Sequence, residues 1–421
     1  MIDSNWIEDL LTKSKDNTIK ENKQNTNTLE NELIQKIIDD CYSLNQKDES
    51  KPIGRLLASA FDLVVSADYY SSVGHKGWFY CGSPTPNLFF HYTNCCPRHA
   101  LENIFHFHQS SKPESGSIGK STSRLLRNFL SQLLIKNNKT EKILKGSEPV
   151  DIVIVNEDTN HILFGEIKAS PLLTVPLVMD SEAIICDENS KQSDHLNDET
   201  ITISKIYNQK FYLFLPIRKD SIWIDSKVEF DERYDATDKF WGYRSMIKLL
   251  KTNADFLADY FEFWNEALNK YHPRMTDSIF WLTNGCGAPN PRPKFWPRAK
   301  NGLGEGYESI SDSKTSVGMD RTDDIKKGIY QVLKLGSEGK SVDSKWKFKV
   351  GIVSNIHAAR HFEEYLESLI NLIWTHDKSG RAVVAGDLDK DHPMYNLFDG
   401  IISLSQSHFR DEWLRKTFEL K

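Results

Sequence analysis

Cysteine is scarce in this chain of 421 residues. Six cysteines are scattered along the sequence, and they are Cys41, Cys81, Cys95, Cys96, Cys186 and Cys286. A small secreted scaffold held together by disulfides has a much denser set of cysteines, so this class is excluded. The cysteine content is typical of a protein from a reducing compartment.

Long apolar runs are missing as well. No segment approaches the ~20 apolar residues that a membrane-spanning helix requires. The first residues, MIDSNWIEDLL, lack the basic and then apolar pattern of a signal peptide. With 39% hydrophobic and 27% charged residues, the composition is that of an ordinary soluble protein. We therefore expect a cytoplasmic protein with no membrane partner.

Positive charge is not in excess, because the formal net charge is -6 at pH 7. This value excludes a uniformly basic nucleic-acid coat, although local clusters of Lys and Arg can still bind DNA. A phosphate-binding glycine loop is absent too, since the residue upstream of Gly119-Lys120-Ser121 that should be glycine is Glu114. Together with the lack of a convincing methyltransferase glycine motif, this argues against a multifunctional motor enzyme.

The most informative stretch that is present runs from residue 149 to 170, PVDIVIVNEDTNHILFGEIKAS. Two short runs rich in Ile, Val and Phe, residues 151–155 and 162–167, flank the polar turn 156–160. This pattern predicts a β-hairpin with two antiparallel strands.

Charged residues stand at the open end of this hairpin. Asp151 begins the first strand, and Glu166 and Lys168 end the second. Because side chains alternate across a strand, Glu166 and Lys168 point to the same face. Carboxylate oxygens bind Mg²⁺, and a neighbouring lysine can orient a water that the metal has acidified. The hairpin therefore predicts a site for metal-assisted phosphodiester hydrolysis, with Asp151 and Glu166 as metal ligands.

An acid two residues before a lysine is common in this chain, so the triplet alone decides nothing. Other examples are Glu21 to Lys23, Asp225 to Lys227, Asp312 to Lys314, Asp324 to Lys326 and Asp343 to Lys345. The triplet at Glu166 differs because it ends an apolar strand whose hairpin partner begins with an acid. The run before Asp225, residues 211–216, offers no such acid.

Pro149, Asp151 and the Glu166-x-Lys168 triplet across a hairpin resemble the PD-(D/E)xK core of type II restriction endonucleases. The proline and the aspartate are one residue further apart than in the tightest form of the motif. The resemblance covers about twenty residues. It implies a Mg²⁺-dependent, site-specific endonuclease of a restriction-modification system, which cuts double-stranded DNA as a homodimer, with Asp151, Glu166 and Lys168 as catalytic residues.

The expected fold class is α/β, with a restriction-endonuclease-like core in which helices flank a mixed β-sheet. We divide the chain into a mostly helical N-terminal region (1–111), the first part of the nuclease core with the hairpin (112–170), an insertion (171–275) and the second part of the core with C-terminal elements (276–421). The resemblance implies that such an insertion carries base recognition or the dimer interface.

Hydrophobic periodicity predicts the remaining elements. Helices are expected at residues 29–44, 52–70, 121–135, 246–270, 323–335 and 357–374, and residues 1–50 are otherwise taken as a peripheral helical arm with a loop, since residues 16–28 are rich in Asn, Lys and Thr. Strands are expected at 278–283 and 348–354, and residues 211–216 and 221–225 are expected to form a second hairpin.

A basic segment, residues 112–145, precedes the catalytic hairpin and suits a contact with phosphates, although a solvated helix face explains the same residues. Nucleases of this kind often carry another acid on the first core helix. The helix at 121–135 has none, so Glu102 or Glu114 could complete the metal site. Gln331 and Lys334 are further polar candidates on a later helix.

Two other stretches carry recognisable chemistry. Cys81, Cys95, Cys96 and His99 could form a zinc site, but their spacing is poor and a packed turn is favoured. Residues 290–300, NPRPKFWPRAK, mix cations with aromatic rings on a proline-rich loop. Such a loop fits either a DNA contact or a braced surface loop.

Two alternatives to a restriction enzyme stay open. One is a structure-specific repair or junction nuclease, and the other is a catalytically inactive DNA-binding protein. Neither the recognition sequence and cut position nor the base-contacting residues follow from the sequence.

Overall fold

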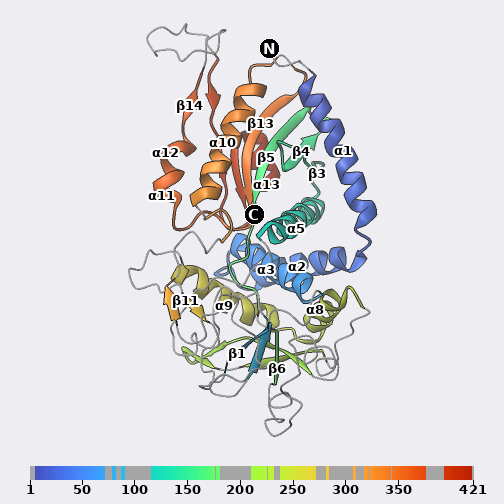
Figure 1. The fold of residues 1–421 in the computed structure, drawn as a ribbon, viewed down its shortest axis with the longest axis vertical. Coiled ribbons are helices and arrows are strands. Elements are labelled where there is room, and N and C mark those ends of the chain that lie inside the picture. The colour runs from blue at the N-terminus through green and yellow to red at the C-terminus, as the bar shows by residue number, and fades with distance from the viewer. Residues whose placement is uncertain are drawn as a thin grey trace, which may run out of the picture. The chain divides into compact units, whose positions relative to one another are not determined.

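The structure is a computed structural model in which the chain forms two compact units (Figure 1). It describes residues 5–71, 78–81, 87–90, 115–175, 177–180, 210–224, 226–231, 238–271, 281–283, 307–309, 317–320, 322–342, 344–375 and 393–419. Unit 1 consists of Met1–Thr26, Gly119–Ser170 and Val317–Lys421. Unit 2 consists of Asn27–Ile118 and Pro171–Ser316. The N-terminal region is thus shared between the two units, and the division made from the sequence stays a prediction.

Unit 1 is built on a six-stranded mixed sheet with the strand order β17-β16-β13-β5-β4-β3. Its strands are β3 (Lys142–Lys145), β4 (Ile152–Asn156), β5 (His161–Lys168), β13 (Lys347–Ser354), β16 (Gly400–Ser403) and β17 (His408–Phe409). Strands β5, β13 and β16 are parallel, whereas β3, β4 and β17 pair antiparallel with their neighbours. The expected mixed sheet with flanking helices is confirmed at this coarse level.

The predicted catalytic hairpin is present as β4 and β5. Every residue of β4 is buried, which suits its Ile-Val-Ile-Val sequence. In the turn, the Asn156 side chain accepts a hydrogen bond from the Thr159 backbone N–H at 3.1 Å, and Asn160 has a positive φ of 55°. Both features are typical of asparagine in tight turns, so the polar sequence itself closes the hairpin.

Helix α1 (Trp6–Gln24) agrees with the expected helical arm, but it is not peripheral, and it extends into the residues where a loop was expected. Its residues Ile7, Leu10 and Leu11 are buried in the same core as Phe164 of β5. Figure 1 shows α1 in blue beside β3, at the edge of the sheet. The polar patch that suggested a loop remains helical to Gln24, because polar contacts hold it. The Thr18 hydroxyl accepts from the Lys145 N–H at 2.8 Å, and Glu21 accepts from Arg127 at 2.9 Å.

Two further long helices belong to unit 1. They are α5 (Ser115–Lys136) and α10 (Thr322–Gly339), and both helix predictions are confirmed. Ile325 and Val332 of α10 lie in the sheet core, whereas Leu333, which follows Val332 directly, is 44% exposed. A short helix, α13 (Glu412–Phe418), ends the described chain.

The expected helix at residues 357–374 is wrong. The chain forms only α11 (Phe362–Tyr365), α12 (Glu367–Ile370) and the strand β14 (Ile373–Trp374), which pairs with β15 (Tyr395–Asn396). The backbone N–H groups of Arg360 and His361 donate to the carboxylate of Asp320. Asp320 therefore satisfies donors at the start of α11, where the first turn of a helix leaves N–H groups without partners, and the interruptions lie further on, at Leu366 and after Ile370.

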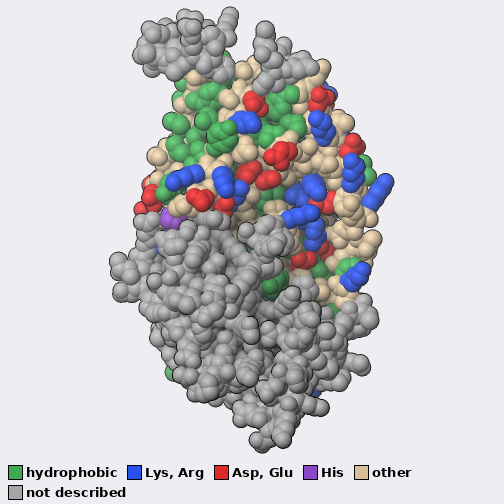
Figure 2. Space-filling view, viewed as in Figure 1, with side chains coloured by type: hydrophobic (Ala, Val, Ile, Leu, Met, Phe, Trp, Pro, Cys, Tyr) green, Lys and Arg blue, Asp and Glu red, His purple; other side chains and the backbone are tan. Residues whose placement is uncertain are grey.

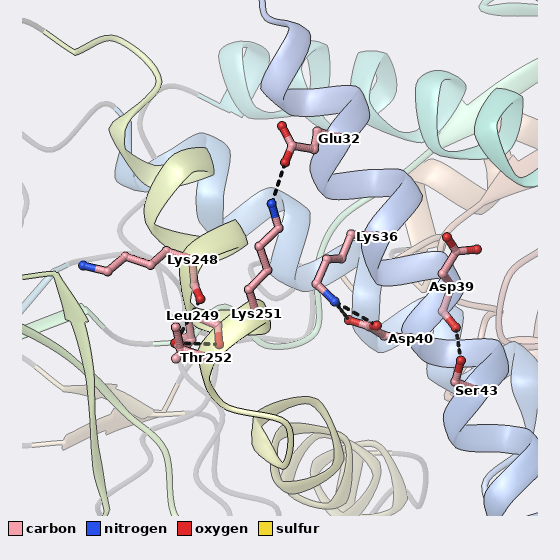
Figure 3. Close-up of polar contacts among 9 residues, drawn as sticks. All are labelled: Glu32, Lys36, Asp39, Asp40, Ser43, Lys248, Leu249, Lys251 and Thr252. Carbon is pink, nitrogen blue, oxygen red and sulfur yellow. Dashed lines mark hydrogen bonds and ion pairs between the residues drawn. The ribbon is translucent and has the colours of Figure 1, made fainter.

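Unit 2 combines helices with a second sheet of order β1-β2-β6-β7-β10. Its helices are α2 (Thr28–Lys47), α3 (Ile53–Tyr70), α8 (Trp241–Thr252) and α9 (Phe256–Tyr271). Its strands are β1 (Trp78–Cys81), β2 (Asn87–Phe90), β6 (Leu177–Asp180), β7 (Phe211–Phe214), β8 (Ile217–Lys219), β9 (Ile222–Ile224), β10 (Lys227–Asp231), β11 (Trp281–Thr283) and β12 (Tyr307–Ser309). Figure 3 shows α2 and α8 joined by an ion pair between Glu32 and Lys251 at 3.0 Å.

Two sequence expectations for unit 2 need correction. The single helix expected at 246–270 is interrupted between α8 and α9, where Asn253 is extended and its side chain accepts from the Asp255 N–H. The hairpin expected between residues 211–216 and 221–225 is paired differently. Strand β9 pairs with β8 across Asp220 and Ser221, both with positive φ, while β7 pairs with β10.

Across the described part of the chain, no helix is both long enough and apolar enough to cross a membrane.

Candidate active site

The strand register brings the three predicted catalytic residues to one face of the sheet in unit 1. Ile152 of β4 pairs with Gly165 of β5, so Asp151 lies across from Glu166. Phe164, two residues before Glu166, points into the core shared with α1 and α10, and alternation puts Glu166 and Lys168 on that same face. The three side chains therefore gather where β5 ends.

Hydrogen bonds fix the position of each group. The Asp151 carboxylate Oδ2 accepts from the Ile167 backbone N–H at 3.0 Å, and the Asp151 N–H donates to the Gly165 carbonyl at 3.0 Å. The Lys168 ammonium Nζ lies 2.7 Å from Glu166 Oε1. Their side chains are only 16% and 12% exposed, so water screens this ion pair weakly.

The electrostatic balance of the site is unfavourable for a charged Glu166. Burial raises the pKa of Glu166, the nearby Asp151 carboxylate raises it further, and Lys168 opposes both effects. Two carboxylates thus share one ammonium in a partly dry position. A bound divalent cation would relieve this excess of negative charge, and hard cations prefer such oxygen ligands.

The two carboxylates of Asp151 and Glu166 are enough protein ligands for Mg²⁺. Within the described ranges, no group of three or more His, Cys, Asp or Glu residues could hold a metal ion. Mg²⁺ is commonly bound through one or two carboxylates, with waters or phosphate oxygens at its other positions. Asp151 and Glu166 therefore fit the metal by the chemistry of their donor atoms.

Several elements hold the end of β5 in place. Ser170 and Asn355 form a pair of hydrogen bonds, in which the Ser170 N–H donates to Asn355 Oδ1 at 3.1 Å and Asn355 Nδ2 donates to the Ser170 carbonyl at 2.9 Å. Thr122 of α5 donates its hydroxyl to the Ala169 carbonyl at 2.9 Å. The sequence analysis missed Asn355 and Thr122, and the only signal was that Asn355 directly follows an apolar strand.

Part of the basic segment before the hairpin is structural. Arg127 of α5 is 9% exposed and donates to both carboxylate oxygens of Glu21 at 2.9 Å. Lys145 lies 3.2 Å from the same Glu21. These cations tie α1, α5 and β3 together, which favours a structural role for Arg127 and Lys145, and the phosphate contact of the basic segment stays a prediction.

The helix α10 passes over the strand next to the site. A side chain at Gly328 would meet the Ile352 side chain at 2.8 Å, and Ile352 pairs with Glu166 in the sheet. Gln331 lies one turn further along, and its Oε1 is buried with no hydrogen-bond partner among the described residues. No described contact links Gln331 or Lys334 to the catalytic groups, so their role stays a prediction.

Other predicted site residues lie outside the described residues. These are Glu102 and Glu114, the zinc candidates Cys95, Cys96 and His99, and the proline-rich loop 290–300. Cys81 is described only as the last residue of β1.

Comparisons with protein-family models, with curated proteins and with solved structures found no match to this chain.

Proposed function

We propose that this chain is a Mg²⁺-dependent endonuclease that cuts double-stranded DNA at specific sites, as a type II restriction enzyme does. The observation that carries the proposal is the convergence of Asp151, Glu166 and Lys168 on one sheet face, with Lys168 held 2.7 Å from Glu166. Two acids that share one cation at the end of a rigid strand suit metal-assisted hydrolysis of a phosphodiester.

Each residue has a distinct task in this proposal. Asp151 and Glu166 would hold Mg²⁺, and the hydrogen bond from the Ile167 N–H fixes the position of the Asp151 carboxylate. The bound metal supplies Lewis-acid stabilisation of the negative charge that builds up on the scissile phosphate. Lys168 would turn its ammonium from Glu166 to the attacking water and position this water for in-line attack. Its positive charge would stabilise the hydroxide that forms when the water loses a proton to the solvent.

The same proposal covers the partners. The enzyme works as a homodimer on duplex DNA, since two copies related by a twofold axis match a palindromic site. Residues 171–275, within unit 2, take part in recognition of the DNA.

The decisive experiment incubates the purified protein with long duplex DNA of known sequence, in Mg²⁺ or in a chelator. Discrete fragments are expected only with Mg²⁺, and Lys168→Ala should abolish them. Lys23→Ala is the matched control, because Lys23 also ends an acid-x-Lys triplet but is exposed in the last turn of α1. This control should cleave at the rate of the unmodified protein.

The outcome also separates the alternatives. Cleavage of junctions or flaps without discrete duplex fragments would favour the repair nuclease, and DNA binding without any cleavage would favour the inactive DNA-binding protein. If the protein neither binds nor cleaves any DNA, the proposal is refuted.

Metal binding has a readout that does not require activity. A ligand that binds only the folded state stabilises it by about 2.7 kcal/mol at a concentration 100 times its Kd. Mg²⁺ should therefore raise the melting temperature of the unmodified protein. Glu166→Gln should abolish this rise, because an amide replaces one of the two metal-binding carboxylates.

A further inference from the structure

The chain leaves unit 1 directly behind the catalytic strand. The middle segment of unit 1 ends at Ser170, two residues after Lys168, and Pro171 is the first residue of the next segment of unit 2. The chain returns to unit 1 at Val317, and the N–H of the following residue, Gly318, donates to the Ser170 carbonyl at 2.8 Å. Departure and return thus meet at one residue beside the candidate active site.

Unit 1 holds Ser170 through both its backbone N–H and its carbonyl. The N–H donates to Asn355 Oδ1 at 3.1 Å, and the carbonyl accepts from Asn355 Nδ2 at 2.9 Å as well as from Gly318. Asn355 is fully buried and directly follows β13, whose last residue, Ser354, pairs with Lys168. A movement of Ser170 within unit 1 therefore requires breaking these bonds.

Unit 2 holds the residues that come next. The N–H groups of Leu172 and Leu173 donate to the buried Asp62 carboxylate at 2.9 and 3.0 Å. The Leu173 carbonyl accepts from the Tyr260 hydroxyl at 2.8 Å. Both leucine side chains are fully buried. The segment that enters unit 2 is thus anchored from its second residue onward.

One residue, Pro171, lies between these two anchors. Its ring fixes φ at about −65°, so ψ is its one soft backbone torsion. A proline also restricts the residue before it to extended conformations, and that residue is Ser170. Because one residue spans at most ~3.6 Å of chain, the link between Ser170 and Leu172 has no slack.

Charge on unit 1 favours no single orientation of a DNA duplex on the visible face. Figure 2 shows Lys and Arg side chains interspersed with Asp and Glu over the described part of unit 1, on the side where Figure 1 shows α5 and α10. A surface of mixed sign steers a polyanion less than a continuous basic area does. A second contact has to supply the orientation, and the proposed function assigns this contact to unit 2.

We propose that the Pro171 link couples unit 2 to the catalytic strand, so that DNA held by unit 2 sets the position of Lys168. Because the link has no slack, a displacement of the Asp62 anchor passes to Ser170 and strains the Asn355 bonds, two residues after Lys168. Asn355 and Asp62 are the positioning residues at the two ends of the link. The inference rests on the proposed function for the identity of the ligand, whereas the coupling itself does not.

Hydrogen-exchange mass spectrometry of the full-length protein tests the coupling without DNA. Asp62→Asn in unit 2 should speed the exchange of the Ser170 amide in unit 1 about 10-fold or more. Asn355→Ala in unit 1 should speed the exchange of Leu172 and Leu173 about as much. Overlapping peptides separate the two sides, and Pro171 has no amide proton between them. Asp62→Asn keeps the shape of the side chain and decides alone if Asn355→Ala does not fold.

A longer link should abolish both effects. Three glycines inserted between Pro171 and Leu172 add roughly 10 Å of flexible chain and leave both anchors intact. In this background each substitution should speed exchange only on its own side. The matched control carries the same glycines between the exposed residues Glu49 and Ser50, between α2 and α3, and should keep the effect across the link. The inference fails if neither substitution acts across Pro171, or if the effect persists with the longer link.

Cleavage kinetics test what the coupling does for the proposed reaction. The insertion after Pro171 should lower kcat about 100-fold, since a catalytic group misplaced by about 1 Å loses that much rate, and should leave KM for DNA unchanged. The insertion after Glu49 should change neither. An unchanged kcat with the longer link overturns the inference and leaves the nuclease. If the unmodified protein cleaves no DNA, the proposed function fails, and the exchange measurements still decide the coupling.

Discussion

Asp62 of α3 offers the sharpest test of how the chain is held once it leaves the catalytic strand. This side chain is fully buried, and its Oδ2 accepts three hydrogen bonds. The donors are the backbone N–H groups of Leu172 and Leu173, at 2.9 and 3.0 Å, and the indole N–H of Trp264 at 2.7 Å. Asp62 therefore anchors the extended segment that follows β5 directly in the chain.

The expected cost of Asp62→Asn follows from these three bonds. A hydrogen bond to a charged group contributes roughly 1 kcal/mol more than one between neutral groups, so three weakened bonds cost about 3 kcal/mol. A tenfold change in an equilibrium constant corresponds to about 1.4 kcal/mol. The amide protons of Leu172 and Leu173 should consequently exchange with solvent about 100-fold faster, if they exchange through local opening of this segment.

Hydrogen-exchange mass spectrometry of the peptide that contains this segment measures the effect. Asp40→Asn is the matched control, because Asp40 on the surface of α2 pairs only with Lys36 in Figure 3 and contributes about 0.5 kcal/mol. If Asp62→Asn changes the exchange of Leu172 and Leu173 no more than Asp40→Asn does, the Asp62 bonds do not hold the segment and the reasoning is wrong.

Three further variants test other parts of the structure. The pKa of Glu166 is raised above its ordinary value of 4.5. The protonated side chain therefore contributes to the stability of the folded state below pH 4.5, and this contribution is lost as the pH rises through the raised pKa. In the presence of a chelator, Glu166→Gln should therefore raise the melting temperature at alkaline pH and have little effect below pH 4.5. A lower melting temperature of the variant at alkaline pH would contradict this. Gly351→Ala should lower the free energy of unfolding, measured by urea denaturation, by about 1–3 kcal/mol, because its new Cβ would lie 2.3 Å from a backbone oxygen of β16. Gly119→Ala is the control: its Cβ meets no atom within 4 Å, so this change should be neutral or stabilising. Lys340→Met should lower the free energy of unfolding by about 3–5 kcal/mol in the same assay, because the Asp399 carboxylate, which is 4% exposed and 2.8 Å from Lys340, loses its cation. A decrease no larger than that for a surface ion pair would refute the stabilising role of this buried pair.

Local sequence signals were sufficient where neighbouring residues decide the structure. The hairpin of β4 and β5 could be predicted because its β-branched runs and its Asn-rich turn act within about twenty residues. The common face of Glu166 and Lys168 follows from strand alternation alone. The helices α3 and α5 could be predicted for the same reason, since their apolar stripes are continuous.

Predictions failed where distant residues compete with local preference. The periodic stretch after β13 does not become one helix, because Ile373 and Trp374 pair as β14 with the distant strand β15. Leu333 fits the apolar period of α10 but lies on its outer face, because Gly328 and Val332 already occupy the contact with the sheet. Periodicity reports that a side chain is apolar, but it does not report which surface covers it.

The sequence by itself determined the chemistry of the candidate site, because Asp151, Glu166 and Lys168 belong to one hairpin whose geometry is local. The tertiary structure decided what surrounds this chemistry. Asn355 holds Ser170 only because β13, far along the chain, pairs in parallel with β5. Likewise, Glu21 neutralises Arg127 only because α1 lies at the β3 edge of the sheet. Such contacts depend on chain segments that meet only after folding, and no local pattern encodes which segments those are.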